Sequence, residues 1–243
     1  MLRDVTSRLI SLVLDANDPT RLAHFWSVAL GWAEFHNGDE IGLTPPDGTA
    51  CDILFEPVAE TKTGQNRIHL DLTTTSAEDQ HDTVERLLEL GARHIDIGQL
   101  PDETHVVLAD PEGNEFCVLA PGNNFLAGCG RLGAINCDGT RDVGVFWSEA
   151  FGWPLVWDEQ EETAIRAPHP LGPMITWSGP PLIPKHGKNR LHLDIAPVGT
   201  DQHTEVERLL ALGASKADVG QGDVTWVVMA DADGNEFCVL SPQ

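Results

Sequence analysis

Two pairs of residues, each a histidine and a glutamate, stand at equivalent places in the chain. His69 lies in the stretch NRIHLDL and His192 in NRLHLDI, while Glu115 and Glu236 each begin an EFCVL segment. Side chains alternate across a strand, so each histidine and its glutamate are expected on one face of a sheet, with the apolar side chains on the other. A neutral imidazole and a carboxylate are ligands that Zn, Fe, Mn or Ni accepts. The pairs therefore predict a divalent-metal site.

The same residues have an ordinary structural interpretation. A strand histidine such as His69 can hydrogen-bond a neighbouring carboxylate, here Asp71. Glu115 can lie in solvent at its strand end or pair with Arg67. Recurrence in both halves of the chain favours a functional site, but duplication copies residues whether or not they work.

An internal repeat spans nearly the whole chain. The segment DPEGNEFCVL at 110–119 returns as DADGNEFCVL at 231–240, and FWSVALGW at 25–32 returns as FWSEAFGW at 146–153. The offset stays at 121 to 123 residues, which predicts two homologous domains, 1–122 and 128–243. The segment between them, PGNNFLAGCG at 121–130, is rich in Gly, Pro and Asn and suits a linker.

Each half carries one order of secondary-structure signals twice. A strand is predicted at 8–14, Asp18 and Pro19 begin a helix that Gly31 ends, and short strands follow at 33–36, 40–44 and 51–56. A strand at 67–73, a helix from Ser76 to Gly91 and strands at 93–97, 105–109 and 115–119 repeat this order. In the second half, helices are expected at 141–151 and 201–212. The βαβββ order predicts an α+β fold with helices on one face of each sheet.

Composition limits the partners. The chain has 38 acidic and 15 basic residues, a net charge of -23, which repels nucleic acid and anionic membranes. The charge is explained by solubility alone, and it would favour a cationic ligand if charge steers binding. No apolar run has the length of a membrane span, and the N-terminus lacks the features of a secretory signal. Five scattered cysteines read as reduced thiols, so a cytoplasmic location is expected.

The βαβββ order, FWSVALGW, the HLDL strand and the DPEGNEF hairpin together resemble the vicinal oxygen chelate (VOC) superfamily, which includes glyoxalase I, extradiol dioxygenases and bleomycin resistance proteins. The chain is most similar to the glyoxalase-like branch, in tandem. The resemblance implies that paired modules form cupped mixed or antiparallel sheets. It also implies a metal held by a histidine on the fifth strand and a glutamate on the eighth, positions matched by His69 with Glu115 and by His192 with Glu236.

The chain departs from the metal-using pattern on its first strand. Where metal-using members carry His or Gln, this chain has Ser11, with its counterpart near Ala134. A further ligand position of glyoxalase I falls near Asp52, with Ile175 or Thr176 across from it in the second half. Other residues expected to line a cup are Asp71, His105, Asp194 and Trp226.

Two functions follow from the resemblance. The first is an enzyme of lyase, isomerase or dioxygenase type, in which a metal on His69 and Glu115 acts as a Lewis acid toward adjacent oxygens of a substrate, with Asp71 or Asp52 as base. The second is a metal-free protein that binds or sequesters a small cationic molecule, as in the bleomycin-resistance branch. Either would be a monomer or a homodimer.

The site depends on which modules pair. If the modules of one half form a cup, Asp52 joins His69 and Glu115, and the first half keeps the better site. If modules pair across the halves, Asp52 meets His192 and Glu236. In either case Phe116 and Phe237 should face the helices, so Phe116→Ala and Phe237→Ala should destabilise strongly, whereas Glu115→Ala should cost little.

Overall fold

The computed structural model describes residues 7–48, 51–100, 102–169 and 172–242. The described chain consists of four βαβββ modules, two in each half, as the sequence predicts. In the first half the elements are β1 (Ser7–Ala16), α1 (Pro19–Leu30), β2 (Ala33–Asn37), β3 (Glu40–Thr44) and β4 (Asp52–Pro57), with a short 3-10 turn at Pro46–Gly48, followed by β5 (Ile68–Leu72), α2 (Ala77–Glu89), β6 (Arg93–His94), β7 (Val106–Ala109) and β8 (Glu115–Val118).

The second half repeats this order. Its elements are β9 (Leu132–Cys137), α3 (Arg141–Phe151), β10 (Leu155–Glu159), β11 (Glu162–Arg166) and β12 (Met174–Trp177), then β13 (Leu191–Pro197), α4 (Gln202–Leu212), β14 (Ser215–Lys216), β15 (Val227–Ala230) and β16 (Glu236–Val239). None of the helices in the described ranges is both long and apolar enough to cross a membrane.

The helices begin where the capping residues predict. The Asp18 side chain accepts a hydrogen bond from the backbone N–H of Arg21 at 3.1 Å, and Gly31 ends α1 in the left-handed conformation with φ of 72°. Ser76 caps α2 in the same way, through the N–H of Asp79 at 3.0 Å. The strand bounds differ from the expected ones by at most three residues, with the largest difference at β6 and none at β3.

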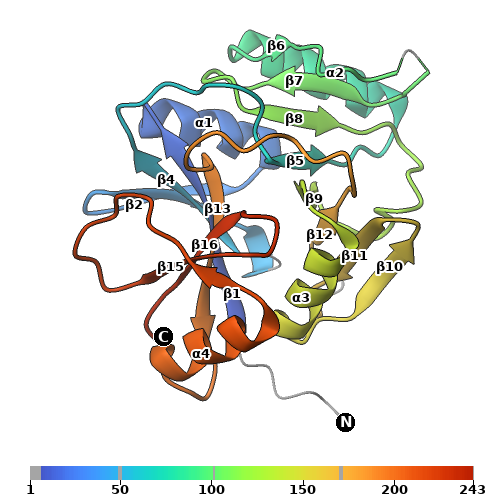
Figure 1. The fold of residues 1–243 in the computed structure, drawn as a ribbon. Helices are drawn as coiled ribbons and strands as arrows, with labels where there is room; N and C mark the ends of the chain where they lie inside the picture. The colour runs from blue at the N-terminus through green and yellow to red at the C-terminus, as the bar shows by residue number, and fades with distance from the viewer. Residues whose placement is uncertain (1–6, 49–50, 101, 170–171, 243) are drawn as a thin grey trace.

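The modules pair across the two halves of the chain. Sheet A has the strand order β14-β15-β16-β13-β1-β4-β3-β2, and sheet B has β10-β11-β12-β9-β5-β8-β7-β6. The first module therefore shares sheet A with the fourth through antiparallel β1 and β13, and the second shares sheet B with the third through β5 and β9. In Figure 1 the blue strands of the N-terminus lie beside the orange strands of the C-terminus. The assumption that each half forms its own cup is wrong, and the cross-half alternative is confirmed.

Each sheet has an apolar face against the helices. On β8, Phe116 is fully buried and meets Phe25 and Trp26 of α1, with ring centroids 5.9 and 5.1 Å apart. On β16, Phe237 meets Trp147 of α3 at 4.8 Å. Because α1 packs on sheet A and α3 on sheet B, these aromatic contacts join the two sheets back to back in one core.

The repeated D-x-x-G-N turn is a structural device. The Asp110 carboxylate accepts hydrogen bonds from the N–H groups of Glu112 and Asn114, both at 2.9 Å, and from the indole Nε1 of Trp26 at 3.1 Å. Gly113 reverses the chain with φ of 94°. Asp231 binds Trp147 in the same way. The repeated turn therefore connects each hairpin to a helix through a hydrogen bond from a tryptophan indole.

Candidate functional site

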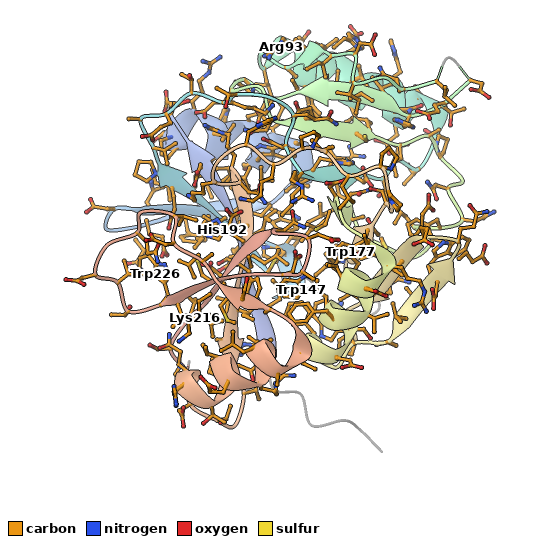
Figure 2. The ribbon with its side chains drawn as sticks, viewed as in Figure 1. Arg93, Trp147, Trp177, His192, Lys216 and Trp226 are labelled. Atoms are coloured by element: carbon orange, nitrogen blue, oxygen red, sulfur yellow. The ribbon has the colours of Figure 1, made fainter. Side chains whose placement is uncertain are left out.

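A cavity of about 760 Å³ opens on the helix-free face of sheet A, here called cup A. Side chains alternate between the two faces along each strand of the cavity floor. Leu12, Ile53 and Leu193 face the core, and their neighbours in the sequence face the cavity. Figure 2 labels two of its residues, His192 on β13 and Trp226 just before β15. The residues of β1, β4, β13 and β16 that line the cavity include Ser11, Asp52, Leu54, Glu56, His192, Asp194, Glu236 and Cys238.

Both halves of the chain contribute to cup A. The register places Ser11 beside Asp52 on one side and beside Asp194 on the other. The Ser11 hydroxyl donates to Asp194 Oδ2 at 3.3 Å, and Asp52 accepts from the hydroxyl of Thr44 at 2.8 Å. Five of the sequence-predicted site residues therefore meet here with Trp226: Ser11, Asp52, His192, Asp194 and Glu236.

The lining of cup A is acidic and partly apolar. Five carboxylates face two groups that can be cationic, Lys188 and His192. Lys188 is already paired with Asp15, through contacts of 2.7 and 2.9 Å. Trp226 is 36% exposed and lies at the cavity with aliphatic side chains of β4 and β15. The carboxylates are Glu40, Asp52, Glu56, Asp194 and Glu236.

Glu236 is held by a lysine that the sequence analysis missed. Lys185 Nζ forms an ion pair with Glu236 Oε1, and the backbone N–H of Asn189 donates to Oε2 at 3.3 Å. Both oxygens of this carboxylate are thereby engaged from one loop, residues 178–190. The signal was present in the sequence, since KHGKNR at 185–190 repeats KTGQNR at 62–67.

The same arrangement occurs in sheet B. Lys62 Nζ lies 2.6 Å from Glu115 Oε1, with 10% of the lysine side chain and 6% of the glutamate side chain exposed. Glu115 is therefore neither a solvated strand end nor the partner of Arg67, and both of those interpretations are wrong. Arg67 instead pairs with Asp138, with 2.8 Å between Nε and Oδ2. The expectation that Glu115→Ala costs little stability assumed an exposed glutamate. Because Glu115 is buried, the structure does not support that expectation.

The helix-free face of sheet B, here called cup B, is partly covered by the linker between the halves, and a pocket of about 330 Å³ remains beside Ile95, Ile97 and Glu115. Leu126 is buried against Val107, Cys117 and Met174 of this face, and Phe125 packs on Trp157 with ring centroids 5.4 Å apart. Arg166 fixes the linker further, since its guanidinium donates to Ala127 O at 3.4 Å and contacts Cys129 Sγ at 3.0 Å. Residues of the linker, 121–130, thus pack on the face of sheet B that is equivalent to the cavity-lining face of sheet A.

The remaining predicted residues lie in sheet B. His69 is 3.4 Å from Asp71, between Nε2 and Oδ1, which matches its structural interpretation. Burial alone lowers the pKa of His69, but the hydrogen bond to Asp71 and the nearby charges of Asp71 and Glu115 outweigh it and raise the pKa. His105 pairs with Glu103 at 3.2 Å. The position across from Ala134, equivalent to Asp52, holds Met174 rather than Ile175 or Thr176.

A metal on the predicted histidine and glutamate pairs does not fit these side chains. Glu236 and Glu115 each have a lysine ammonium against one oxygen, so an added cation would have to displace a lysine whose side chain is 29% or 10% exposed. The first-strand position offers only the hydroxyl of Ser11, which is already bonded to Asp194. Among the described residues, the groups with metal-ligand spacing are His69 with Asp71 and Cys117, and His192 with Asp194 and Cys238.

The cysteines of the two cups are weak nucleophiles as they stand. Burial raises the pKa of Cys117 and Cys238, and the neighbouring carboxylates Asp71 and Asp194 raise it further. Both side chains are therefore neutral thiols at neutral pH, which slows their reactions as nucleophiles.

Comparison with known proteins places the fold. A family model described as the glyoxalase-like domain matches the chain twice, at residues 11–119 and 134–240. No curated protein matches. Among solved structures, glyoxalase I from Zea mays is similar with a TM-score of 0.68 at 14% identity, over 98% of this chain and 92% of that one.

Two single-site variants of the same maize enzyme are also similar. Their TM-scores are 0.67 and 0.65 at 14% and 13% identity, over 98% and 96% of this chain and 93% of each variant. At such identity the likeness shows the fold alone, whereas the family model covers most of the sequence. The chain therefore belongs to the glyoxalase-like domain family, with two copies of the domain in tandem.

Proposed function

We propose that the protein binds a small organic cation with an apolar or aromatic body, and that it does so in cup A. The observation that carries this proposal is the difference between the two cups: one holds an open acidic cavity of about 760 Å³, and the other is partly covered by the linker. A cavity of this size accommodates a drug-sized molecule.

The charge of cup A selects the ligand. Lys188 and Lys185 neutralise Asp15 and Glu236, which leaves Glu40, Asp52, Glu56 and Asp194 without a lysine or arginine partner among the described residues. Carboxylates at a partly desolvated wall attract a cation and repel an anion. The indole of Trp226 adds a face on which a quaternary ammonium group can lie, worth about 0.5 to 2 kcal/mol.

Titration calorimetry with phenyltrimethylammonium and with benzenesulfonate tests the proposal, because the two probes have similar size and opposite charge. The cation should bind with one equivalent per chain, and its affinity should fall as salt is added. Trp226→Ala should weaken it several-fold, and Asp52→Asn with Glu56→Gln by about tenfold, which is about 1.4 kcal/mol.

Two control variants match these changes. His105→Ala alters the repeat counterpart of Trp226 in sheet B, and Glu162→Gln removes an exposed charge on β11. Neither should change the affinity for the cation. Equal or tighter binding of benzenesulfonate would refute the cationic ligand, and unchanged binding in Trp226→Ala and in the double variant would refute cup A.

A metal-dependent enzyme acting on adjacent oxygens is the second candidate. Its support is the group formed by His192, Asp194 and Cys238, because the predicted histidine and glutamate pair is blocked by Lys185. Chelator treatment separates the candidates: binding of phenyltrimethylammonium should survive complete removal of metal if the organic cation is recognised by the carboxylates and Trp226.

A further inference from the structure

The floor of cup A has three side chains that can bind a metal ion. They are a different set of donors from the predicted pair of His192 and Glu236. A ring nitrogen of His192, a carboxylate oxygen of Asp194 and Cys238 Sγ all lie within 4.8 Å of one another. His192 and Asp194 are two residues apart on β13, and Cys238 is level with Asp194 on the neighbouring strand β16. Glu236 is not a member of this group.

The distance between the first two donors is informative. His192 Nε2 and Asp194 Oδ1 are 3.4 Å apart, the same distance as between His69 and Asp71, which suits a long hydrogen bond as well as two ligands of one ion. Two ligands that each lie about 2.0 to 2.1 Å from a tetrahedral ion stand about 3.3 to 3.4 Å apart. Because both pairs show this distance, the spacing belongs to the H-x-D strand.

One unpartnered polar atom of the described residues lies at the same place, Asp194 Oδ1, whereas the unpartnered Nδ1 of His192 is on the other side of the ring from the proposed donor Nε2. The His192 side chain is 8% exposed, and its Nδ1 has no hydrogen-bond partner among the described residues; the same holds for Asp194 Oδ1. Such buried polar atoms cost stability unless something satisfies them. Asp194 Oδ2 is already oriented by Ser11, which leaves Oδ1 as the oxygen directed to His192.

We propose that His192, Asp194 and Cys238 form a site in cup A for one borderline or soft divalent ion of the Zn²⁺ and Co²⁺ type. Imidazole, carboxylate and thiolate are ligands of such ions, and the open cavity leaves the fourth position to water or to a ligand donor. Binding replaces the Cys238 thiol proton, so one proton is released per ion. The sulfur has to approach by roughly 1 Å at most to reach a bonding distance.

The equivalent group in cup B is not available in the same way. Cys117 is packed beneath Leu126 of the linker, with Val107 and Met174 around it. His69 of this group is 26% exposed against 8% for His192, so the difference between the cups lies at the cysteine and its linker neighbour and not at the histidine. The proposal therefore assigns one equivalent to each chain and does not depend on the organic cation.

Cobalt titration of the chelator-treated full-length chain tests the site, because a cysteine thiolate bound to Co²⁺ gives a charge-transfer band in the near ultraviolet. Wild type should show this band with a plateau at one equivalent. Cys238→Ser should lose the band, and Asp194→Asn should weaken binding by about tenfold or more. Ser11→Ala should weaken it by about tenfold, since Ser11 orients a ligand.

Three control variants separate this site from others. Cys117→Ser and Cys129→Ser should keep the band, and so should Glu236→Gln, because Glu236 belongs to the predicted donor pair and not to the proposed one. Circular dichroism confirms that each variant is folded. Absence of the band from wild type, its persistence in folded Cys238→Ser, or its loss in folded Glu236→Gln would each overturn the proposal.

Discussion

Lys62 and Glu115 form an ion pair of 2.6 Å at a place where only 10% of the lysine side chain and 6% of the glutamate side chain are exposed. The glutamate that resembles a family metal ligand is thus neutralised by the chain's own ammonium group. Lys185 and Glu236 repeat this pair in sheet A, with more of the lysine exposed at 29%. The repeated K-x-G-x-N-R motif supplies both lysines. Each ion pair attaches the loop that carries the motif to the last strand of the same module.

Removing one member of the buried pair should be costly. Glu115→Ala is expected to lower the free energy of unfolding by about 3 to 5 kcal/mol, because Lys62 is left as a buried charge without compensation. Urea denaturation measures the change, with Glu162→Ala on exposed β11 as the control, expected within about 0.5 kcal/mol of wild type. Lys62→Met with Glu115→Leu should recover most of the loss. Similar values for Glu115→Ala and Glu162→Ala would contradict the buried pair.

The aromatic junction between the sheets should also be sensitive. Phe116→Ala and Phe237→Ala are each expected to cost about 3 to 5 kcal/mol, since both side chains are fully buried against tryptophans of α1 and α3. Trp226→Ala, which truncates an aromatic side chain that is 36% exposed, should cost far less in the same denaturation series. A larger loss for Trp226→Ala than for Phe116→Ala would mean that the faces of the sheets are assigned the wrong way round.

The linker should act as the occupant of cup B. Leu126→Ala removes a side chain that is 3% exposed and is expected to cost about 2 to 4 kcal/mol, with a cavity left over Cys117. Alkylation of Cys117 by iodoacetamide, followed by mass spectrometry under native conditions, should become faster in this variant. Cys137, which lies in the core away from cup B, is the internal control. Unchanged alkylation of Cys117 would argue against linker packing as its protection.

His69 should contribute a pH-dependent part of the stability. Its pKa in the folded chain lies above the ordinary 6.5, because Asp71 and Glu115 favour the protonated ring despite burial. This contribution is complete below pH 6.5 and is lost as pH rises through the raised folded pKa. Urea denaturation of wild type and His69→Asn between about pH 5.5 and about pH 8 should show their stability difference changing with that sign. A difference independent of pH would contradict the raised pKa.

The sequence was sufficient for the modules, helix caps and strand faces because these depend on local signals. Asp18 with Pro19 and Gly31 bounds a helix, and the alternation around Phe116 sets its face. Strand pairing between distant modules depends on long-range contacts that no local sequence pattern encodes. The sequence therefore left open whether β1 pairs with β5 or with β13.

The site was predictable in part. His192, Asp52 and Trp226 were named from the repeat and the resemblance, and the structure places them at one cavity. The loop lysine Lys185 was missed, although K-x-G-x-N-R occurs twice, because a long side chain can reach a strand that is distant in sequence. The linker was read only as a connection, since nothing in Phe125 and Leu126 tells which face would bury them.

The central claim is that cup A is the open ligand site and cup B is not. Two-dimensional ¹H–¹⁵N spectra of the tryptophan indole groups test it most directly, with signals assigned by Trp226→Phe and Trp157→Phe. Titration with phenyltrimethylammonium should shift the Trp226 signal with saturation and leave the signal of Trp157, which packs on the linker, in place. A saturable shift of Trp157 with none at Trp226 would contradict the account.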